Sequence, residues 1–280
     1  MSSTVAAAPE QAGGAGLGPA LKAARSRLGL VAALFAIAAV GWWWTGHRMA
    51  GMDDGPWTAL GTLSWFLGAW VVMMAAMQLP SVAPTVALYS RKTKERSPVL
   101  AAVFAAGYLL TWAVAGVLAF AVGRATGLID GDVFSWDDAG RWIAGGTLLV
   151  AAAYEVTPLK DACLDKCRSP LGFLLGAWRD GRAGALQMGA RHGGWCVGCC
   201  WALMASLFAL GVMSIPWMAF VAGLIAVEKL LPWRRVATYA TAAILLVLGL
   251  LLLIAPDAVP ALTVHGSGAM PSMERMEVSP

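Results

Sequence analysis

The chain has 280 residues, of which 59% are hydrophobic and only 13% are charged, and its mean hydropathy is +0.69. Soluble domains are about half apolar, so this composition excludes an ordinary soluble protein. The formal net charge of +4 arises from short basic clusters between apolar runs, which argues against a nucleic-acid partner.

Seven apolar runs reach or approach the roughly 20 residues that a helix needs to cross about 30 Å of hydrocarbon. Lipid offers no hydrogen-bond partner to the backbone and no alternating barrel pattern is present, so we expect an all-α, polytopic transmembrane helix bundle of about seven helices. We expect this bundle to lie in the lipid bilayer of the plasma (inner) membrane. The predicted spans are 28–46, 64–90, 98–121, 140–156, 196–213, 215–231 and 237–255.

The sequence divides into one membrane domain and two tails. Residues 28–256 form the predicted transmembrane domain, which includes a cytoplasmic or re-entrant segment at about 157–195. Residues 1–27 and 257–280 are small, polar or proline-containing and are predicted to be disordered. No small-residue cleavage site closes the first apolar run, so the first helix is predicted to be uncleaved.

Charges between the spans predict the orientation. The basic side holds Lys22, Arg25 and Arg27, then Arg91, Lys92, Lys94 and Arg96, then Lys160, Lys166, Arg168, Arg179, Arg182 and Arg191, and finally Arg234 and Arg235. The opposite loops hold Asp53, Asp54, Asp130, Asp132, Asp137 and Asp138. By the positive-inside rule the N-terminus is cytoplasmic and the C-terminus is outside.

Span two combines methionines with prolines. Met73 and Met77 lie one helical turn apart, and thioethers are soft ligands that suit Cu(I), although methionine also fills gaps in apolar cores. Pro80 and Pro84 remove two intrahelical hydrogen bonds, so a kink is expected.

All five cysteines lie in one stretch of the chain. Cys163 and Cys167 are spaced i, i+4, which places both thiols on one face of a helix. Cys196 and Cys199 form a C-x-x-C pair that lets two thiolates converge on one metal, and Cys200 adds a third sulfur. The cytoplasmic side is reducing, which favours metal binding or redox chemistry over disulfides; the alternative is that these small apolar residues only pack helices.

Three further residues are candidates at the same membrane level. His192 precedes the C-x-x-C pair, and the following Gly193 and Gly194 predict a sharp turn into span five. His192 either completes a cysteine-rich site or is an interfacial, solvent-accessible histidine. Glu155 ends span four and Glu228 ends span six, and buried carboxylates usually face a partner or a polar cavity. Lys229, next to Glu228, points about 100° away and is expected either to contribute to a polar site or to snorkel.

Four ordered blocks carry a family resemblance, namely WVVMMAAMQLPSVAP, AYEVTPLKDACLDKCRSP, GGWCVGCCWALM and GVMSIPWMAFVAGLIAVEKLLPW. They closely resemble the segments that define the family of predicted metal-binding integral membrane proteins, sometimes labelled copper chaperones, over residues of about 60–235. The resemblance implies a metal-binding membrane protein. It places the following residues at the family's polar and sulfur-bearing positions: Met73, Met74, Met77, Cys163, Cys167, Cys196, Cys199, Cys200, Met204 and Glu228.

The chain departs from the expected family pattern at two positions. Glutamine is expected where Glu155 stands, and methionine is more common where Gln78 stands. Glu155 is therefore a weaker candidate for a shared ligand, whereas Met77 keeps its role.

Three functions are consistent with the sequence. The first is transition-metal handling, with copper favoured over iron or zinc and with a metal donor or acceptor protein as partner. The second is a membrane oxidoreductase or oxygenase on a lipid-soluble substrate, with Glu155, Glu228 and His192 as harder ligands. The third is a scaffold or transport subunit without metal. No P-loop, zincin or nucleophile-elbow motif is present, which argues against ATP-driven pumping by this chain alone.

Overall fold

The structure is a computed structural model that describes residues 25, 27–48, 62–93, 98–125, 141–176, 178–210 and 214–255. Within these residues every regular element is a helix, which confirms the all-α prediction. The predicted tails, apart from Arg25 and Arg27, and the acidic loops lie outside the described residues. The helices are α2 (Leu28–Arg48), α3 (Leu63–Lys92), α4 (Pro98–Ala125), α5 (Arg141–Glu155), α6 (Pro158–Arg168), α7 (Pro170–Gly176), α8 (Gly181–Leu210), α9 (Ile215–Leu230) and α10 (Arg234–Ile254).

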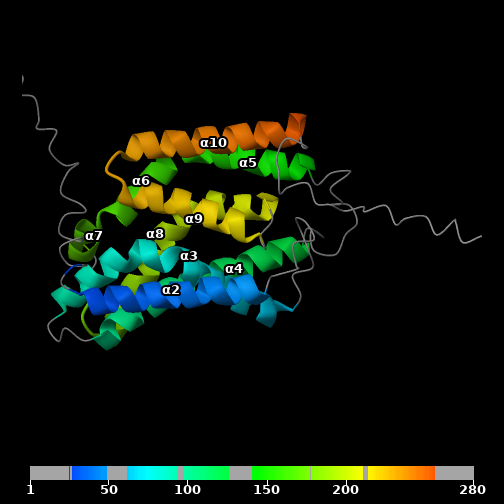
Figure 1. Cartoon of the computed structure of the whole chain (residues 1–280). Coiled ribbons are helices and arrows are strands. Elements are labelled where there is room, and N and C mark those ends of the chain that lie inside the picture. Colours follow the sequence, from blue (N-terminus) through cyan, green and yellow to red (C-terminus); the bar gives the residue numbers. More distant parts are fainter. Residues whose placement is uncertain are drawn as a thin grey trace, which may run out of the picture.

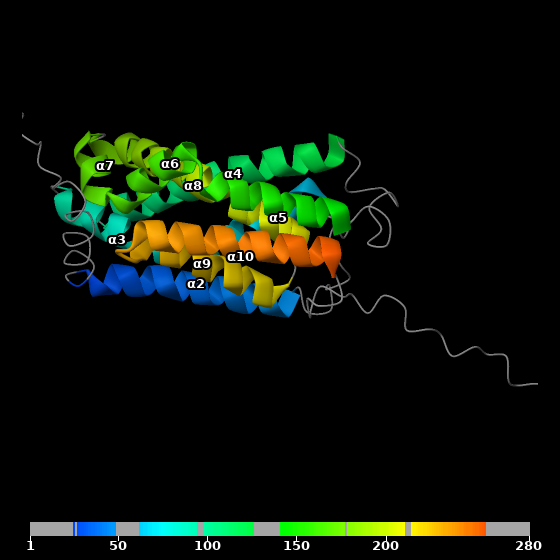
Figure 2. The same cartoon turned by 90° about the horizontal axis from the view of Figure 1, so that it is seen from above.

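The long helices run side by side along one axis, as Figures 1 and 2 show. The short helices α6 and α7 lie together at one end of this bundle, and α2 and α10 both begin at that end (Figure 1). We call it the α6–α7 end.

Helix α3 is the most buried of the four long apolar helices α2, α3, α4 and α10. It begins at the N-cap Thr62, whose hydroxyl accepts a hydrogen bond from the Trp65 backbone N–H at 3.4 Å, and it continues through Pro80 and Pro84. In its most apolar stretch 72% of the residues are buried, against 22% to 39% in α2, α4 and α10. The side chains of α3 are therefore placed to meet several neighbouring helices.

In the part of the chain that the structure describes, four helices are long and apolar enough to cross a membrane, namely α2, α3, α4 and α10. The number rises to five if α5 and α6, which meet at an angle of 68°, form one broken span. Pro158 begins α6 directly after this bend, and Thr157 caps it with a side-chain bond to the Lys160 N–H. These findings support a membrane protein by helix length and composition.

The segment predicted at 157–195 is helical almost throughout, and the predicted turn at Gly193 and Gly194 is wrong. Helix α8 runs without interruption from Gly181, whose φ of +77° suits glycine, and passes through both residues. The glycines of α8 instead allow close packing on α4. A Cβ added at Gly189 would lie 1.9 Å from the Phe104 carbonyl oxygen, and one added at Gly193 would lie 2.9 Å from the Tyr108 carbonyl oxygen.

Candidate metal centre

Three thiols lie on one side of α8. Cys196 and Cys200 are one helical turn apart, and their sulfur atoms are 3.6 Å from each other. The Cys199 and Cys200 sulfur atoms are 3.5 Å apart. All three residues are at most 2% exposed, and their sulfur atoms lie within 4.8 Å of one another. This spacing allows one metal ion to contact several of them.

A fourth thiol reaches this group from α6. The Cys167 sulfur lies 3.6 Å from the Cys199 sulfur, so the structure brings together sulfur atoms from two separate stretches of the chain. Cys163, one turn earlier on α6, lies against the backbone of α8: a Cβ added at Gly198 would be 2.8 Å from its sulfur. We name Cys167, Cys196, Cys199 and Cys200 the thiol cluster.

Polar groups from three other helices surround Cys196. The Tyr108 hydroxyl of α4 lies 2.9 Å from its sulfur, and the Lys229 ammonium of α9 donates to the same sulfur at 3.0 Å. Gln78 of α3 accepts a hydrogen bond from Lys229 at 3.0 Å and lies within 4.0 Å of the Cys196 and Cys200 sulfurs. Four helices therefore supply atoms around one thiol.

Tyr108 and the role of Gln78 were not predicted from the sequence. The amide of Gln78 in a span-length apolar run was a usable signal, because a buried amide needs a partner. Nothing in the apolar run at 98–121 marked Tyr108 as part of a polar site. The snorkelling alternative for Lys229 is wrong, since that residue is only 7% exposed and its ammonium points to Gln78 and Cys196.

The two glutamates occupy a separate ionic group. Lys160 is fully buried and forms ion pairs with Glu155 of α5 and, at 2.7 Å, with Glu228 of α9. Arg168 adds hydrogen bonds to the backbone carbonyls of Glu228 and Leu231. We name Glu155, Lys160 and Glu228 the ionic triad. The two carboxylates of the triad neutralise Lys160. Glu228 and Lys229 are adjacent in the sequence, yet Glu228 belongs to the ionic triad and Lys229 contacts the thiol cluster.

His192 is buried, so its interpretation as a solvent-accessible interfacial residue is wrong. It is 3% exposed, and its ring lies 5.0 Å from the Phe173 ring and 6.1 Å from the Tyr108 ring. It stands one helical turn before Cys196 on α8, which places both side chains on the same side of the helix. Its Nδ1 has no hydrogen-bond partner among the described residues.

The methionines of α3 are part of the apolar core. Met73 and Met77 are 3% and 4% exposed, and Met74 is fully buried. Met74 is one turn before Gln78, so it shares that residue's side of the helix. Met204 of α8 is also buried, one turn beyond Cys200.

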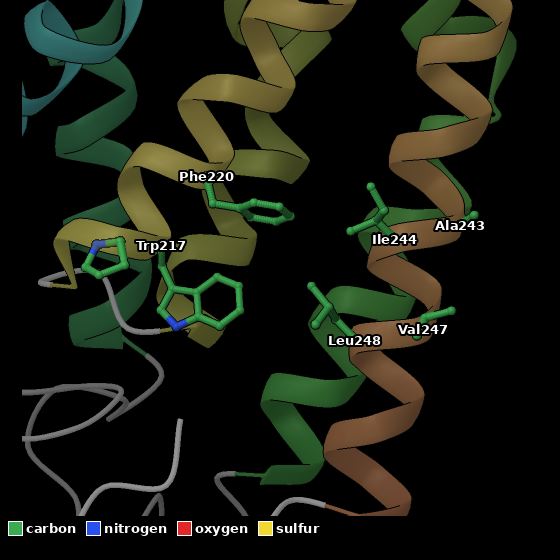
Figure 3. Close-up of a pocket in the computed structure, with 7 residues that line it drawn as sticks. Trp217, Phe220, Ala243, Ile244, Val247 and Leu248 are labelled. Carbon is green, nitrogen blue, oxygen red and sulfur yellow. The ribbon is translucent and has the colours of Figure 1, made fainter. Parts of the chain in front are cut away.

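An apolar cavity elsewhere lacks the chemistry of a metal centre. It has a volume of 650 Å³ and lies between the first half of α9 and α10. Trp217 and Phe220 face Ile244 and Leu248 across it, as Figure 3 shows. No described thiol or charged side chain lines it.

The thiol cluster has the composition of a soft-metal site. Thiolates favour Cu(I), zinc and iron–sulfur clusters, whereas carboxylates and water favour harder ions. The low exposure of Cys196, Cys199 and Cys200 shields their sulfur atoms from water. The donor set present therefore fits a soft transition metal, and Cu(I) is one such ion.

Comparison with known proteins agrees with this chemistry. A family model described as PpoB2 copper chaperone matches residues 67–252, which contain the thiol cluster and make up more than half of the chain. No curated protein and no solved structure matches the chain. The match over this length shows that the chain belongs to the PpoB2 copper chaperone family.

Proposed function

We propose that this protein is an integral membrane copper-handling protein that binds Cu(I) at the thiol cluster, with Cys196, Cys199 and Cys200 as the ligands that hold the metal. The observation that carries this proposal is the convergence of the Cys196, Cys199 and Cys200 sulfur atoms on one side of α8, all within 4.8 Å of one another. The Cys167 sulfur of α6 joins them at 3.6 Å from the Cys199 sulfur. Cu(I) is accommodated by a few thiolates without water, and Cys196, Cys199 and Cys200 are almost completely buried.

The surroundings of Cys196 support an anionic metal complex. A Cu(I) ion bound by two or three thiolates carries net negative charge, which is costly in an apolar bundle. The Lys229 ammonium, 3.0 Å from the Cys196 sulfur, offsets that charge, and the Tyr108 hydroxyl can donate to the same sulfur.

The oxidoreductase alternative has less support. A catalytic iron or copper centre with an open position would use harder ligands such as Glu155 and Glu228. Both carboxylates are ion-paired with Lys160. We therefore favour binding and transfer of the metal over turnover of a substrate.

We further propose that the bundle crosses the plasma membrane seven times, through α2, α3, α4, α5, α8, α9 and α10. With this count the α6–α7 end is cytoplasmic, the N-terminus is on the same side and the C-terminus is outside. Exposed Arg91, Lys92, Lys166, Arg182 and Arg235 support this orientation by the positive-inside rule. The other helix ends carry fewer basic residues among those described, namely Arg48, Arg124 and Arg141.

Elemental analysis of the purified full-length chain tests the metal assignment. Protein isolated in detergent without oxygen from copper-replete cells should contain about one copper per chain, with sulfur ligands in its X-ray absorption spectrum. The Cys196→Ser/Cys199→Ser/Cys200→Ser variant should lose the copper. Cys163→Ser is the matched control, because Cys163 packs against Gly198, and it should keep the copper. Metal-free wild-type protein, or stoichiometric zinc in its place, would refute the assignment.

A further inference from the structure

The four sulfur atoms of the thiol cluster form a connected series. Cys167 is 3.6 Å from Cys199, Cys199 is 3.5 Å from Cys200, and Cys200 is 3.6 Å from Cys196. Within this group Cys196 is held by Lys229 and Tyr108. Among the described hydrogen bonds, Cys167 has one to the Cys199 sulfur and none to Lys229 or Tyr108.

Exposure changes along this series. Cys196, Cys199 and Cys200 are at most 2% exposed, whereas Cys167 is half-buried. Cys167 lies in the last turn of α6, at the α6–α7 end of the bundle, and the preceding Lys166 is exposed. A molecule approaching from that end therefore meets Cys167 before the other three thiols.

The turn that carries Cys167 is fixed in place. The neighbouring Arg168 donates hydrogen bonds to the backbone carbonyls of Glu228 and Leu231 at the end of α9. On the same helix, Asp161 and Asp165 form ion pairs with Arg234 of α10. These contacts hold the thiol near Cys199 while leaving it partly open.

We infer that Cys167 is the exchange thiol through which Cu(I) enters and leaves the buried thiols, its external partner being a thiol-ligated Cu(I) carrier. This inference rests on the proposed copper-binding function and adds a role for one residue. Cys196, Cys199 and Cys200 hold the metal, and Cys167 transfers it.

The transfer is a ligand exchange without redox change. A bond forms between Cu(I) and the Cys167 sulfur as a bond between Cu(I) and a carrier sulfur breaks, and the thiol proton of Cys167 passes to the departing carrier thiolate. The Cys199 thiol, 3.6 Å away, then replaces the remaining carrier sulfur and gives its proton to that departing thiolate. The Cys200 thiol, 3.5 Å from Cys199, finally displaces Cys167 from the metal and returns a proton to the Cys167 sulfur. Copper stays in the +1 state throughout, and release follows the same steps in reverse.

Exchange kinetics test the role of Cys167. Full-length protein in detergent is loaded from a Cu(I)–glutathione complex or from a Cu(I)-bound C-x-x-C peptide, and unloaded with bathocuproine disulfonate. Cys167→Ser should keep the wild-type copper stoichiometry. Its rate of copper exchange should fall to about one tenth of the wild-type rate or below. Cys167→Met retains a soft sulfur and should exchange faster than Cys167→Ser. Cys163→Ser, on the same helix, should exchange at the wild-type rate.

The two donors distinguish a small thiol carrier from a protein carrier, and a Cys167-dependent rate with either supports the inference. Unchanged exchange in Cys167→Ser, with copper bound normally by the wild type, refutes the exchange role alone. Loss of all copper in Cys167→Ser also refutes it, because Cys167 would then be a holding ligand. Wild-type protein without copper refutes the proposed function itself.

A measurement on the wild-type chain needs no substitution. Iodoacetamide applied to metal-free protein should modify Cys167 before Cys196, Cys199 and Cys200, as read by mass spectrometry, and the modified protein should lose fast exchange. Earlier modification of the three α8 thiols would contradict the inference.

Discussion

At the scale of single residues, two buried lysines each neutralise or hydrogen-bond buried polar groups inside the bundle. Lys229 donates to Cys196 and Gln78, and Lys160 pairs with Glu155 and Glu228. A buried charge without a partner is far more costly than a buried pair. The groups that each lysine contacts therefore stabilise its charge inside the bundle. The two groups meet on α9, where Glu228 and Lys229 are neighbours.

We expect Lys160→Met to destabilise the protein strongly, because it leaves two carboxylates buried without a cation. The free energy of unfolding should fall by about 3–5 kcal/mol. Glu155→Gln/Lys160→Met/Glu228→Gln removes all three charges and should recover most of that loss. Thermal unfolding in detergent measures the stability of the single and the triple variant against the wild type.

Lys166→Met serves as the control on the same helix. Lys166 is exposed, so its replacement should change stability by no more than about 0.5 kcal/mol. If Lys160→Met were as stable as the wild type, the ionic triad would not hold α5, α6 and α9 together.

At the scale of elements, the contact between α4 and α8 places Tyr108 against Cys196. Glycine on both helices allows the backbones to approach closely: a Cβ added at Gly107 would lie 2.2 Å from the Leu186 carbonyl oxygen. Because the obstructing atoms belong to the backbone, a side-chain rotation cannot relieve such a clash.

Gly189→Ala should therefore destabilise the bundle, whereas Gly194→Ala on the same helix should not. The Gly189 Cβ would meet the Phe104 carbonyl oxygen, and we expect a loss of about 1–3 kcal/mol or more. A Cβ added at Gly194 would meet no described atom within 4 Å beyond its chain neighbours and the nearby backbone of α8, so helix propensity alone predicts a gain of up to about 1 kcal/mol. Equal thermal midpoints for the two variants would show that α4 and α8 need no glycine contact.

At the scale of the whole molecule, the number of crossings depends on α8 and α9. Helix α8 has 30 residues and is about 45 Å long, enough to cross a bilayer, whereas α9 has 16 residues and is about 24 Å long. Helix α9 packs against α3, α8 and α10, so protein neighbours surround much of it.

Labelling a cysteine at position 214 distinguishes seven crossings from five. In a chain without the native cysteines, Ser214→Cys lies at the start of α9 and should react with a membrane-impermeant maleimide on intact cells. Lys166→Cys should react only after the membrane is permeabilised. Labelling of Ser214→Cys only after permeabilisation would mean that α8 and α9 do not cross.

Much of the helical organisation was predictable from the sequence. The runs at 28–46, 64–90 and 98–121 correspond to α2, α3 and α4, because apolar length alone specifies a helix where lipid is the solvent. The start of α8 was missed because its glycines, spaced for packing on α4, have the composition of a turn.

The sequence by itself determined that this protein is helical and apolar and that its sulfur is concentrated at Cys163, Cys167, Cys196, Cys199 and Cys200. Only the tertiary structure decided that Cys167 joins the three α8 thiols, that Lys229 and Tyr108 contact Cys196, and that the glutamates bind Lys160. Local spacing determines which side of a helix a residue occupies, but the packing of α6 and α9 against α8 determines what that side meets.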